Sequence, residues 1–147
     1  MKILLTTLNS KYVHANLALK YLYTVVAGEY SDVEAREFTI NNDPHYVYGE
    51  ILRGGYDMVC FSCYIWNIEQ IRKLAADLKM ACPELLLTAG GPEASSRGPA
   101  FARENPWVDF VLRGEGEYPF YRLCQVLHEP QRALETVPGL IYRQDGK

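Results

Sequence analysis

The sequence predicts an α/β fold in which a five-stranded parallel sheet carries helices on both faces. Short apolar runs alternate with amphipathic stretches along the 147 residues, in units of about 25 residues that are typical of βα repeats. The run 58–61 is apolar at every position, as a central parallel strand must be when helices cover both of its sides. Together these patterns predict a Rossmann-like (flavodoxin-like) architecture.

The first two βα units are expected within residues 2–55. The patterns predict strands at 2–7 and 32–38, and helices at 16–27 and 42–53. Gly28 follows the first helical pattern, and Gly54 with Gly55 follows the second, as glycines do at helix ends.

Three further units are expected between residues 58 and 130. The patterns predict strands at 58–61, 85–87 and 108–112, and helices at 68–82, 100–104 and 117–128. Asn67 is expected to cap the helix that Pro83 ends. Residues 139–143 resemble a strand that begins a new unit, so we expect a domain at 1–130 and a linker with the start of another domain at 131–147.

Composition excludes several classes of protein. The formal charge is −3 without a cluster of Lys and Arg, which disfavours binding to a nucleic-acid backbone. No apolar run is long enough for a membrane span or a secretory signal. The four cysteines lack the spacing of a disulfide framework, so we expect buried, reduced thiols and a cytoplasmic protein.

Ligands of such folds bind at the carboxyl ends of the strands, which directs attention to the loops at 8–15, 62–67, 90–98 and 113–117. The first loop contains no glycine, although dinucleotide and flavin-phosphate sites use glycine there. It also lacks the acidic residues of a phosphoacceptor domain. These three common uses of the fold are therefore disfavoured.

The loop after the third strand carries unusual side chains. Ser62 ends the strand, where its hydroxyl must find a backbone or ligand partner. Tyr64, Ile65 and Trp66 follow, and such groups either floor a flat ligand or pack under a neighbouring loop. Cys60 and Cys63 form a C-x-x-C motif, so core thiols, a redox site and ligand contact by Cys63 all remain open.

Two more loops carry turn signals. Gly90 and Gly91 allow positive φ or the close approach of a ligand. Glu115 and Glu117 precede a helix, where they cap it or contact a ligand.

Taken together, Ser62, Gly90-Gly91 and the run 113–117 (Arg-Gly-Glu-Gly-Glu) resemble the N-terminal cobalamin (B12)-binding domain of B12-dependent radical S-adenosylmethionine enzymes. The resemblance covers the chain from residue 1 to about 142. It implies that the Ser62 hydroxyl bonds the dimethylbenzimidazole tail of cobalamin and that the glycines keep the tail slot open. The cofactor-binding residues that it implies are Asn9, Ser10, Lys11, Tyr12, His14, Ser62, Cys63, Tyr64, Ile65, Trp66, Gly90, Gly91, Pro92, Glu93, Gly114, Glu115 and Gly116.

The resemblance leaves the lower cobalt ligand open. Domains of the methionine synthase type carry D-x-H-x-x-G in the first loop, and the His of that motif binds cobalt. Here the loop runs from Asn9 to His14 without that Asp or Gly. His14 is thus either a cobalt ligand that lacks its usual orienting partner or an ordinary polar loop residue.

The radical domain of this family carries C-x-x-x-C-x-x-C, which holds a [4Fe–4S] cluster that binds S-adenosylmethionine. This chain lacks that spacing, so the resemblance implies that cluster and S-adenosylmethionine belong to a downstream radical domain. We therefore expect an N-terminal piece that binds cobalamin and has no catalytic residues. The parent enzyme is expected to be a methylase or an anaerobic Mg-protoporphyrin monomethyl ester oxidative cyclase.

Two alternatives belong to other classes. One is a flavodoxin-like domain that binds a flavin or nucleotide. The other is a non-catalytic interaction domain whose aromatic side chains contact a protein.

Overall fold

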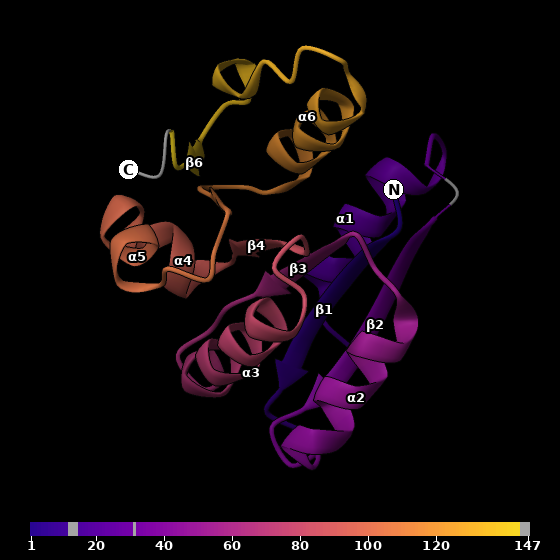
Figure 1. Cartoon of the computed structure of the whole chain (residues 1–147), viewed down its shortest axis with the longest axis vertical. Helices are drawn as coiled ribbons and strands as arrows, with labels where there is room; N and C mark the ends of the chain where they lie inside the picture. The colour runs from indigo at the N-terminus through magenta and orange to yellow at the C-terminus, as the bar shows by residue number, and fades with distance from the viewer. Residues whose placement is uncertain (12–14, 31, 145–147) are drawn as a thin grey trace.

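The structure is a computed structural model that describes residues 1–11, 15–30 and 32–144. Along the chain, strands and helices alternate almost throughout (Figure 1). The elements are β1 (Ile3–Asn9), α1 (Leu17–Ala27), β2 (Val33–Thr39), α2 (Pro44–Gly54), β3 (Met58–Ser62), α3 (Ile68–Ala81), β4 (Leu86–Gly90), α4 (Pro92–Arg97), α5 (Pro99–Glu104), β5 (Phe110–Leu112), α6 (Glu117–His128) and β6 (Leu140–Tyr142), with a 3-10 turn at Leu134–Thr136.

The strands form one sheet in the order β2-β1-β3-β4-β5-β6. The first five are parallel, and β6 runs antiparallel to β5, with Leu112 opposite Leu140. The order 2-1-3-4-5 is that of flavodoxin-like doubly wound sheets, which confirms the predicted α/β class. The sheet has a sixth strand beyond the five that were predicted. β6 pairs with β5 and covers the backbone groups that β5 would otherwise expose at the sheet edge.

Helices cover both faces of the sheet. Helices α2, α3, α4 and α5 pack on one face, against strand residues such as Leu4, Val59 and Leu87. Helices α1 and α6 pack on the other face, against Leu5 and Phe110 among others. In Figure 1, α2 and α3 lie in front of the strands. Two buried faces explain why the central strands are apolar at nearly every position.

Most predicted helix ends are present. The Asn16 side chain accepts a hydrogen bond from the Leu19 amide at 3.2 Å, and Asp43 accepts one from His45 at 2.8 Å. Gly55 ends α2 in the left-handed region at φ 63°, where glycine costs least. Asn67 precedes α3, but its side chain makes no capping bond, so that prediction was wrong.

The region after β4 differs most from the prediction. Helix α4 was not expected, because its six residues are too few to show a helical period. Arg143, just after β6, donates to the carbonyl oxygens of Ala102, Asn105 and Val108. These bonds satisfy the end of α5 and hold β6 on the sheet.

Three of the four cysteines are buried, as predicted, but the prediction was wrong for Cys82, which is exposed. Cys82 follows the last turn of α3 and precedes Pro83, so it lies beyond the apolar face of the helix.

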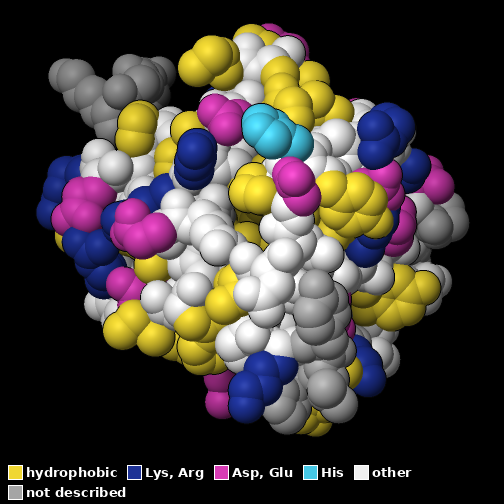
Figure 2. All heavy atoms as spheres, turned by 90° about the horizontal axis from the view of Figure 1, so that it is seen from below, with side chains coloured by type: hydrophobic (Ala, Val, Ile, Leu, Met, Phe, Trp, Pro, Cys, Tyr) yellow, Lys and Arg dark blue, Asp and Glu magenta, His cyan; other side chains and the backbone are white. Residues whose placement is uncertain are grey.

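No helix in the described part of the chain is long and apolar enough to cross a membrane. On the face shown in Figure 2, positive and negative side chains are intermingled.

Candidate functional site

A cleft of about 300 Å³ opens at the carboxyl ends of β3, β4 and β5, between α1 and α6. This is the end of the sheet at which doubly wound folds bind ligands. We call it the β3–β5 cleft. It is lined by Ala18, Leu19, Leu22, Cys60, Phe61, Ser62, Tyr64, Thr88, Gly90, Gly91, Pro92, Leu112, Gly114, Glu115, Gly116, Glu117 and Phe120.

Small residues in matching register form the floor of the cleft. Cys60 pairs with Thr88 on the neighbouring strand, and Ser62 pairs with Gly90. Alternate strand residues share one face, so these four side-chain positions face α1 and α6 together. Because none of them is large, the side chains on this floor leave a gap beneath the two helices. The cleft therefore follows from small residues at alternate positions of two neighbouring strands.

Ser62 contributes a hydroxyl to this floor. The residue is only 6% exposed, and its carbonyl oxygen accepts a hydrogen bond from the Thr7 hydroxyl at 2.9 Å. Within the described residues, no hydrogen bond reaches the Ser62 hydroxyl itself. A nearly buried hydroxyl that lines a cleft without a protein partner is suited to bind a ligand atom there.

The two glycines at the end of β4 have different roles. Gly91 has φ 86°, and a Cβ there would lie 2.8 Å from the Cys63 carbonyl oxygen. Gly91 is therefore required by the backbone turn. A Cβ at Gly90 would meet only Leu112, at 4.0 Å, so any larger side chain there would extend into the cleft.

The loop before α6 forms one rim of the cleft and is held from two sides. The Gly114 amide donates to the Ser95 hydroxyl on α4 at 2.6 Å. The Arg113 amide donates to the Gly139 carbonyl at 3.0 Å, immediately before β6. The position of the rim thus depends on α4 and β6. Pro92 is the one residue of α4 among the lining residues, and no residue of β6 is among them.

The opposite rim is aromatic. The Tyr64 ring stacks on Trp66, with centroids 4.4 Å apart and an interplanar angle of 7°. The Asn16 side-chain amide at the start of α1 donates to the Tyr64 hydroxyl at 3.2 Å. Trp66 and Ile65 are exposed, so they present apolar surface next to the mouth of the cleft.

The structure brings eight of the seventeen predicted cofactor-binding residues into this one cleft. Ser62, Tyr64, Gly90, Gly91, Pro92, Gly114, Glu115 and Gly116 line it. Asn9, Ser10, Lys11, Cys63, Ile65, Trp66 and Glu93 do not line it. Tyr12 and His14 lie outside the described residues, so the cobalt-ligand hypothesis for His14 stays a prediction. The roles of all these residues in cofactor binding are likewise predictions.

The C-x-x-C motif does not form a redox site. Cys63 is fully buried in the core beneath α3, on the opposite face of the sheet from Cys60. Burial raises the pKa of Cys63 to about 12 and that of Cys60 well above its usual value. A reactive thiol needs a lowered pKa, so both groups are core thiols here.

Sequence reasoning missed the walls and part of the floor of the cleft. The missed lining residues are Ala18, Leu19, Leu22, Cys60, Phe61, Thr88, Leu112 and Phe120, whereas Glu117, considered as a cap or a ligand contact, also lines the cleft. The spacing of Thr88 and Gly90, two residues apart and matched by Cys60 and Ser62, was the available signal. The helix residues carry no such signal, because their positions depend on how α1 and α6 pack.

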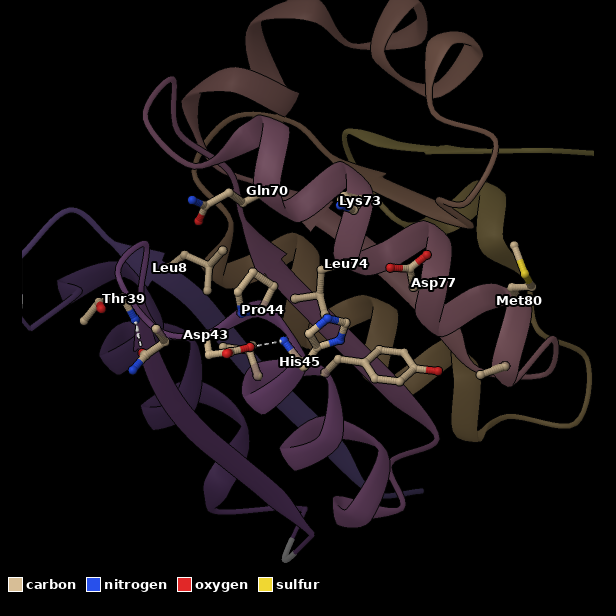
Figure 3. Close-up of a pocket in the computed structure, with 14 residues that line it drawn as sticks. Leu8, Thr39, Asp43, Pro44, His45, Gln70, Lys73, Leu74, Asp77 and Met80 are labelled. Atoms are coloured by element: carbon tan, nitrogen blue, oxygen red, sulfur yellow. Dashed lines mark hydrogen bonds between the residues drawn. The ribbon is translucent and has the colours of Figure 1, made fainter.

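A second hollow lies on the other face of the sheet, between α2 and α3 (Figure 3). This α2–α3 groove has a volume of about 580 Å³. It is lined by Leu8, Thr39, Asn42, Asp43, Pro44, His45, Val47, Tyr48, Gln70, Lys73, Leu74, Asp77, Met80 and Ala81. Several of its polar side chains serve the local backbone: Asn42 accepts from the Thr39 amide at 2.7 Å, and Gln70 donates to the Ile40 carbonyl at 3.2 Å.

No cluster of three or more His, Cys, Asp or Glu side chains in the described residues could hold a metal ion.

A family model described as the B12 binding domain matches residues 3–124. The match includes the floor, both walls and both rims of the β3–β5 cleft.

Two curated relatives match part of the chain. The cobalamin-dependent radical SAM methyltransferase TokK of Streptomyces tokunonensis is 34% identical over 88 residues, which are 60% of this chain and 13% of TokK. A 2-(S-pantetheinyl)-carbapenam-3-carboxylate methyltransferase of Streptantibioticus cattleyicolor is 39% identical over 87 residues, 59% of this chain and 13% of that enzyme. The matched region is thus a small part of these relatives.

Solved structures share the fold. The radical S-adenosylmethionine methyltransferase TsrM from Kitasatospora setae superposes with a TM-score of 0.79 at 19% identity, over 97% of this chain and 28% of TsrM. OxsB, a cobalamin-dependent S-adenosylmethionine radical enzyme solved with aqua-cobalamin and S-adenosylmethionine bound, gives 0.77 at 16% identity, over 99% of this chain and 21% of OxsB.

Proposed function

This chain belongs to the B12-binding domain family, and from that premise we propose that its β3–β5 cleft holds the nucleotide tail of cobalamin. The corrin ring would then lie outside the cleft, across the rims made by the loops at 62–67 and 113–117. Cobalamin supplies methyl-transfer chemistry when bound, and the protein supplies position and shelter.

The nearly buried Ser62 hydroxyl, which has no partner among the described residues, is the observation that carries this proposal. The size of the cleft supports it as well. A hollow of about 300 Å³ is at the lower end of ligand pockets, which suits one flat ring system rather than the whole cofactor. Its floor is small or apolar except for the Ser62 and Thr88 hydroxyls, so an aromatic tail would bury well there.

For the whole protein, we propose a cobalamin-dependent radical S-adenosylmethionine methyltransferase. Its [4Fe–4S] cluster and S-adenosylmethionine would belong to a radical domain downstream of this chain. Two relatives that the chain matches are methyltransferases, which favours methyl transfer over the oxidative cyclase that the sequence also suggested. The division at residue 130, the cytoplasmic location and the absence of a nucleic-acid or membrane partner remain predictions.

The direct test is to titrate the purified chain with hydroxocobalamin, follow the visible absorbance, and then desalt the mixture. Retention of about one cobalamin per chain with a shifted spectrum is the expected result. Flavin mononucleotide serves as the competing ligand in a parallel titration. Retention of the flavin without cobalamin would overturn the proposal in favour of a flavodoxin-like domain.

A further inference from the structure

Asn67 lies at the junction of β3 and α3, and its side chain is fully buried. The carboxamide nitrogen donates to the Leu8 carbonyl at 3.1 Å and to the Ser62 carbonyl and the Thr7 hydroxyl at 3.2 Å each. The carboxamide oxygen accepts from the Tyr64 amide at 2.8 Å. One side chain therefore joins the carboxyl ends of β1 and β3 to the loop that follows β3.

The chemistry of these neighbours requires a carboxamide. The oxygen must face the Tyr64 N–H, which only donates, and the nitrogen must face the Leu8 and Ser62 carbonyls, which only accept. An asparagine satisfies both sides at once in one orientation. A helix cap needs only an acceptor, so the contacts of Asn67 exceed what the start of α3 would demand.

Asn67 also closes the turn that carries the aromatic rim. The backbone amide of Asn67 donates to the Tyr64 carbonyl at 3.1 Å, while its side-chain oxygen accepts from the Tyr64 backbone amide. This reciprocal pair closes a turn around Ile65 and Trp66 and leaves both exposed. The Asn16 side-chain amide donates to the Tyr64 hydroxyl, and the Asn16 backbone amide donates to the Glu37 carboxylate at 2.9 Å.

We infer that Asn67 is a positioning residue for cobalamin, which sets the Ser62 backbone and the stacked Tyr64–Trp66 pair in the geometry that the cofactor meets. This inference rests on the proposed function of the β3–β5 cleft. Asn67 does not line the cleft, so it acts through the groups that it holds. A site that is ordered before binding avoids the entropic cost of ordering it during binding.

The test compares Asn67→Ser with Asn105→Ser. Asn105 is the matched control because it is also a buried asparagine, 1% exposed, and its side chain donates to the Phe101 carbonyl near the end of α5. Both substitutions are made with Trp107→Phe, which leaves Trp66 as the single tryptophan. Hydroxocobalamin affinity and the near-ultraviolet circular dichroism of the Tyr64–Trp66 stack are measured on each protein.

Asn67→Ser is expected to weaken cobalamin binding by about tenfold and to remove most of the Trp66 dichroism of the ligand-free protein. Asn105→Ser is expected to lower thermal stability and leave both readouts within about twofold, because it lies outside the site. Thr7→Val provides a milder, nearly isosteric change to the same hydrogen bonds, with smaller shifts in the same direction.

Two results would overturn the inference. In one, Asn67→Ser and Thr7→Val lower stability while affinity and Trp66 dichroism stay at wild-type values. In the other, Asn67→Ser does not fold and Thr7→Val changes neither readout. Absence of cobalamin binding to the wild-type chain would instead overturn the proposed function, and the inference with it.

Discussion

The α2–α3 groove and the β3–β5 cleft differ in volume and in the chemistry of their lining, and the smaller of the two is the better candidate site. The α2–α3 groove is nearly twice as large as the β3–β5 cleft, yet the cleft has the features of a binding site. The groove lies between two helices, and its polar side chains Asn42, Asp43 and Gln70 bond the nearby backbone. The cleft has glycines in its floor and rims and a hydroxyl without a described partner.

This comparison teaches that the chemistry of the lining identifies a site better than its volume does. A groove between helix surfaces arises wherever side chains are short or splayed. A gap over strand ends arises only where several strands carry small residues at matching positions. The second arrangement involves more coincidences, so it carries more information about function.

The largest expected difference is in the alkylation rates of the cysteine thiols. Cys82 directly follows α3 and is exposed, whereas Cys60 lines the cleft and Cys63 is buried under α3. With a pKa of about 12, about one Cys63 thiol in ten thousand is ionised at pH 8. Iodoacetamide should therefore alkylate Cys82 at least about a thousandfold faster than the buried thiols, as followed by mass spectrometry.

Alkylation of Cys82 alone should leave cobalamin binding unchanged, because this residue is remote from the cleft. Rapid modification of Cys60 in the folded protein would mean that the floor of the cleft is more open than the structure has it. Full alkylation of all four cysteines in denaturant is the control for reagent access.

Filling the cleft should have the next largest effect. Gly90→Leu places a side chain over Leu112 without a backbone clash. The leucine would occupy space in the cleft, so cobalamin affinity should fall by about a hundredfold or more. Equilibrium dialysis with hydroxocobalamin measures the change. Gly28→Leu is the matched control, because a Cβ at Gly28 meets nothing within 4 Å and Gly28 lies outside the cleft.

Thermal unfolding separates occlusion from misfolding. Gly90→Leu should keep its midpoint within a few degrees, corresponding to about 1 kcal/mol or less. Gly91→Val is the less informative variant, since φ 86° and the Cys63 backbone at 2.8 Å predict a loss of folding as well as of binding. Wild-type affinity in a folded Gly90→Leu protein would remove the cleft as the cofactor site.

Ser62 allows steric and polar contributions to be separated. Ser62→Leu should weaken binding by about tenfold or more, because the bulk enters the floor beside Gly90. Ser62→Ala keeps the space and removes one hydrogen bond, worth about 1 kcal/mol, so affinity should fall by about fivefold. Isothermal titration calorimetry compares the two, and equal, unchanged affinities would leave Ser62 without a role in binding.

Filling the groove should have the smallest effect. Asp77→Phe places an aromatic ring in the α2–α3 groove from an exposed position on α3 (Figure 3). Cobalamin affinity should stay within about twofold, and stability should change by about 0.5 kcal/mol. A large loss of cobalamin binding in this variant would reverse the comparison and assign the cofactor to the groove.

Much of the site could be predicted from the sequence, because strand ends are local features. Ser62, Gly90 and Gly91 stand at points where apolar runs stop, and that is visible without a structure. The spacing of Cys60 and Ser62 on β3 and of Thr88 and Gly90 on β4 is also visible in the sequence, although it was not used to predict the floor of the cleft. By contrast, Ala18, Leu22 and Phe120 enter the cleft only through the packing of α1 and α6 against each other.

Three features were decided by tertiary structure alone. β6 joined the sheet because the edge of β5 offered unpaired backbone groups, which a local pattern at 139–143 does not reveal. Asn67 turned away from α3 because Leu8 and Ser62, far apart in sequence, converge beside it. The two cysteines of the C-x-x-C motif were separated to opposite faces because Cys60 lies within β3, and Cys63 leaves it toward α3.

The sequence by itself determined the order of strands and helices and the loops at which a ligand can bind, since hydrophobic period and turn residues act over a few neighbours. Which of those loops meet, how wide the gap between them is, and which polar groups lack partners depended on contacts between distant segments. Those contacts exist only in the folded chain, because strand pairing and helix packing bring the segments together.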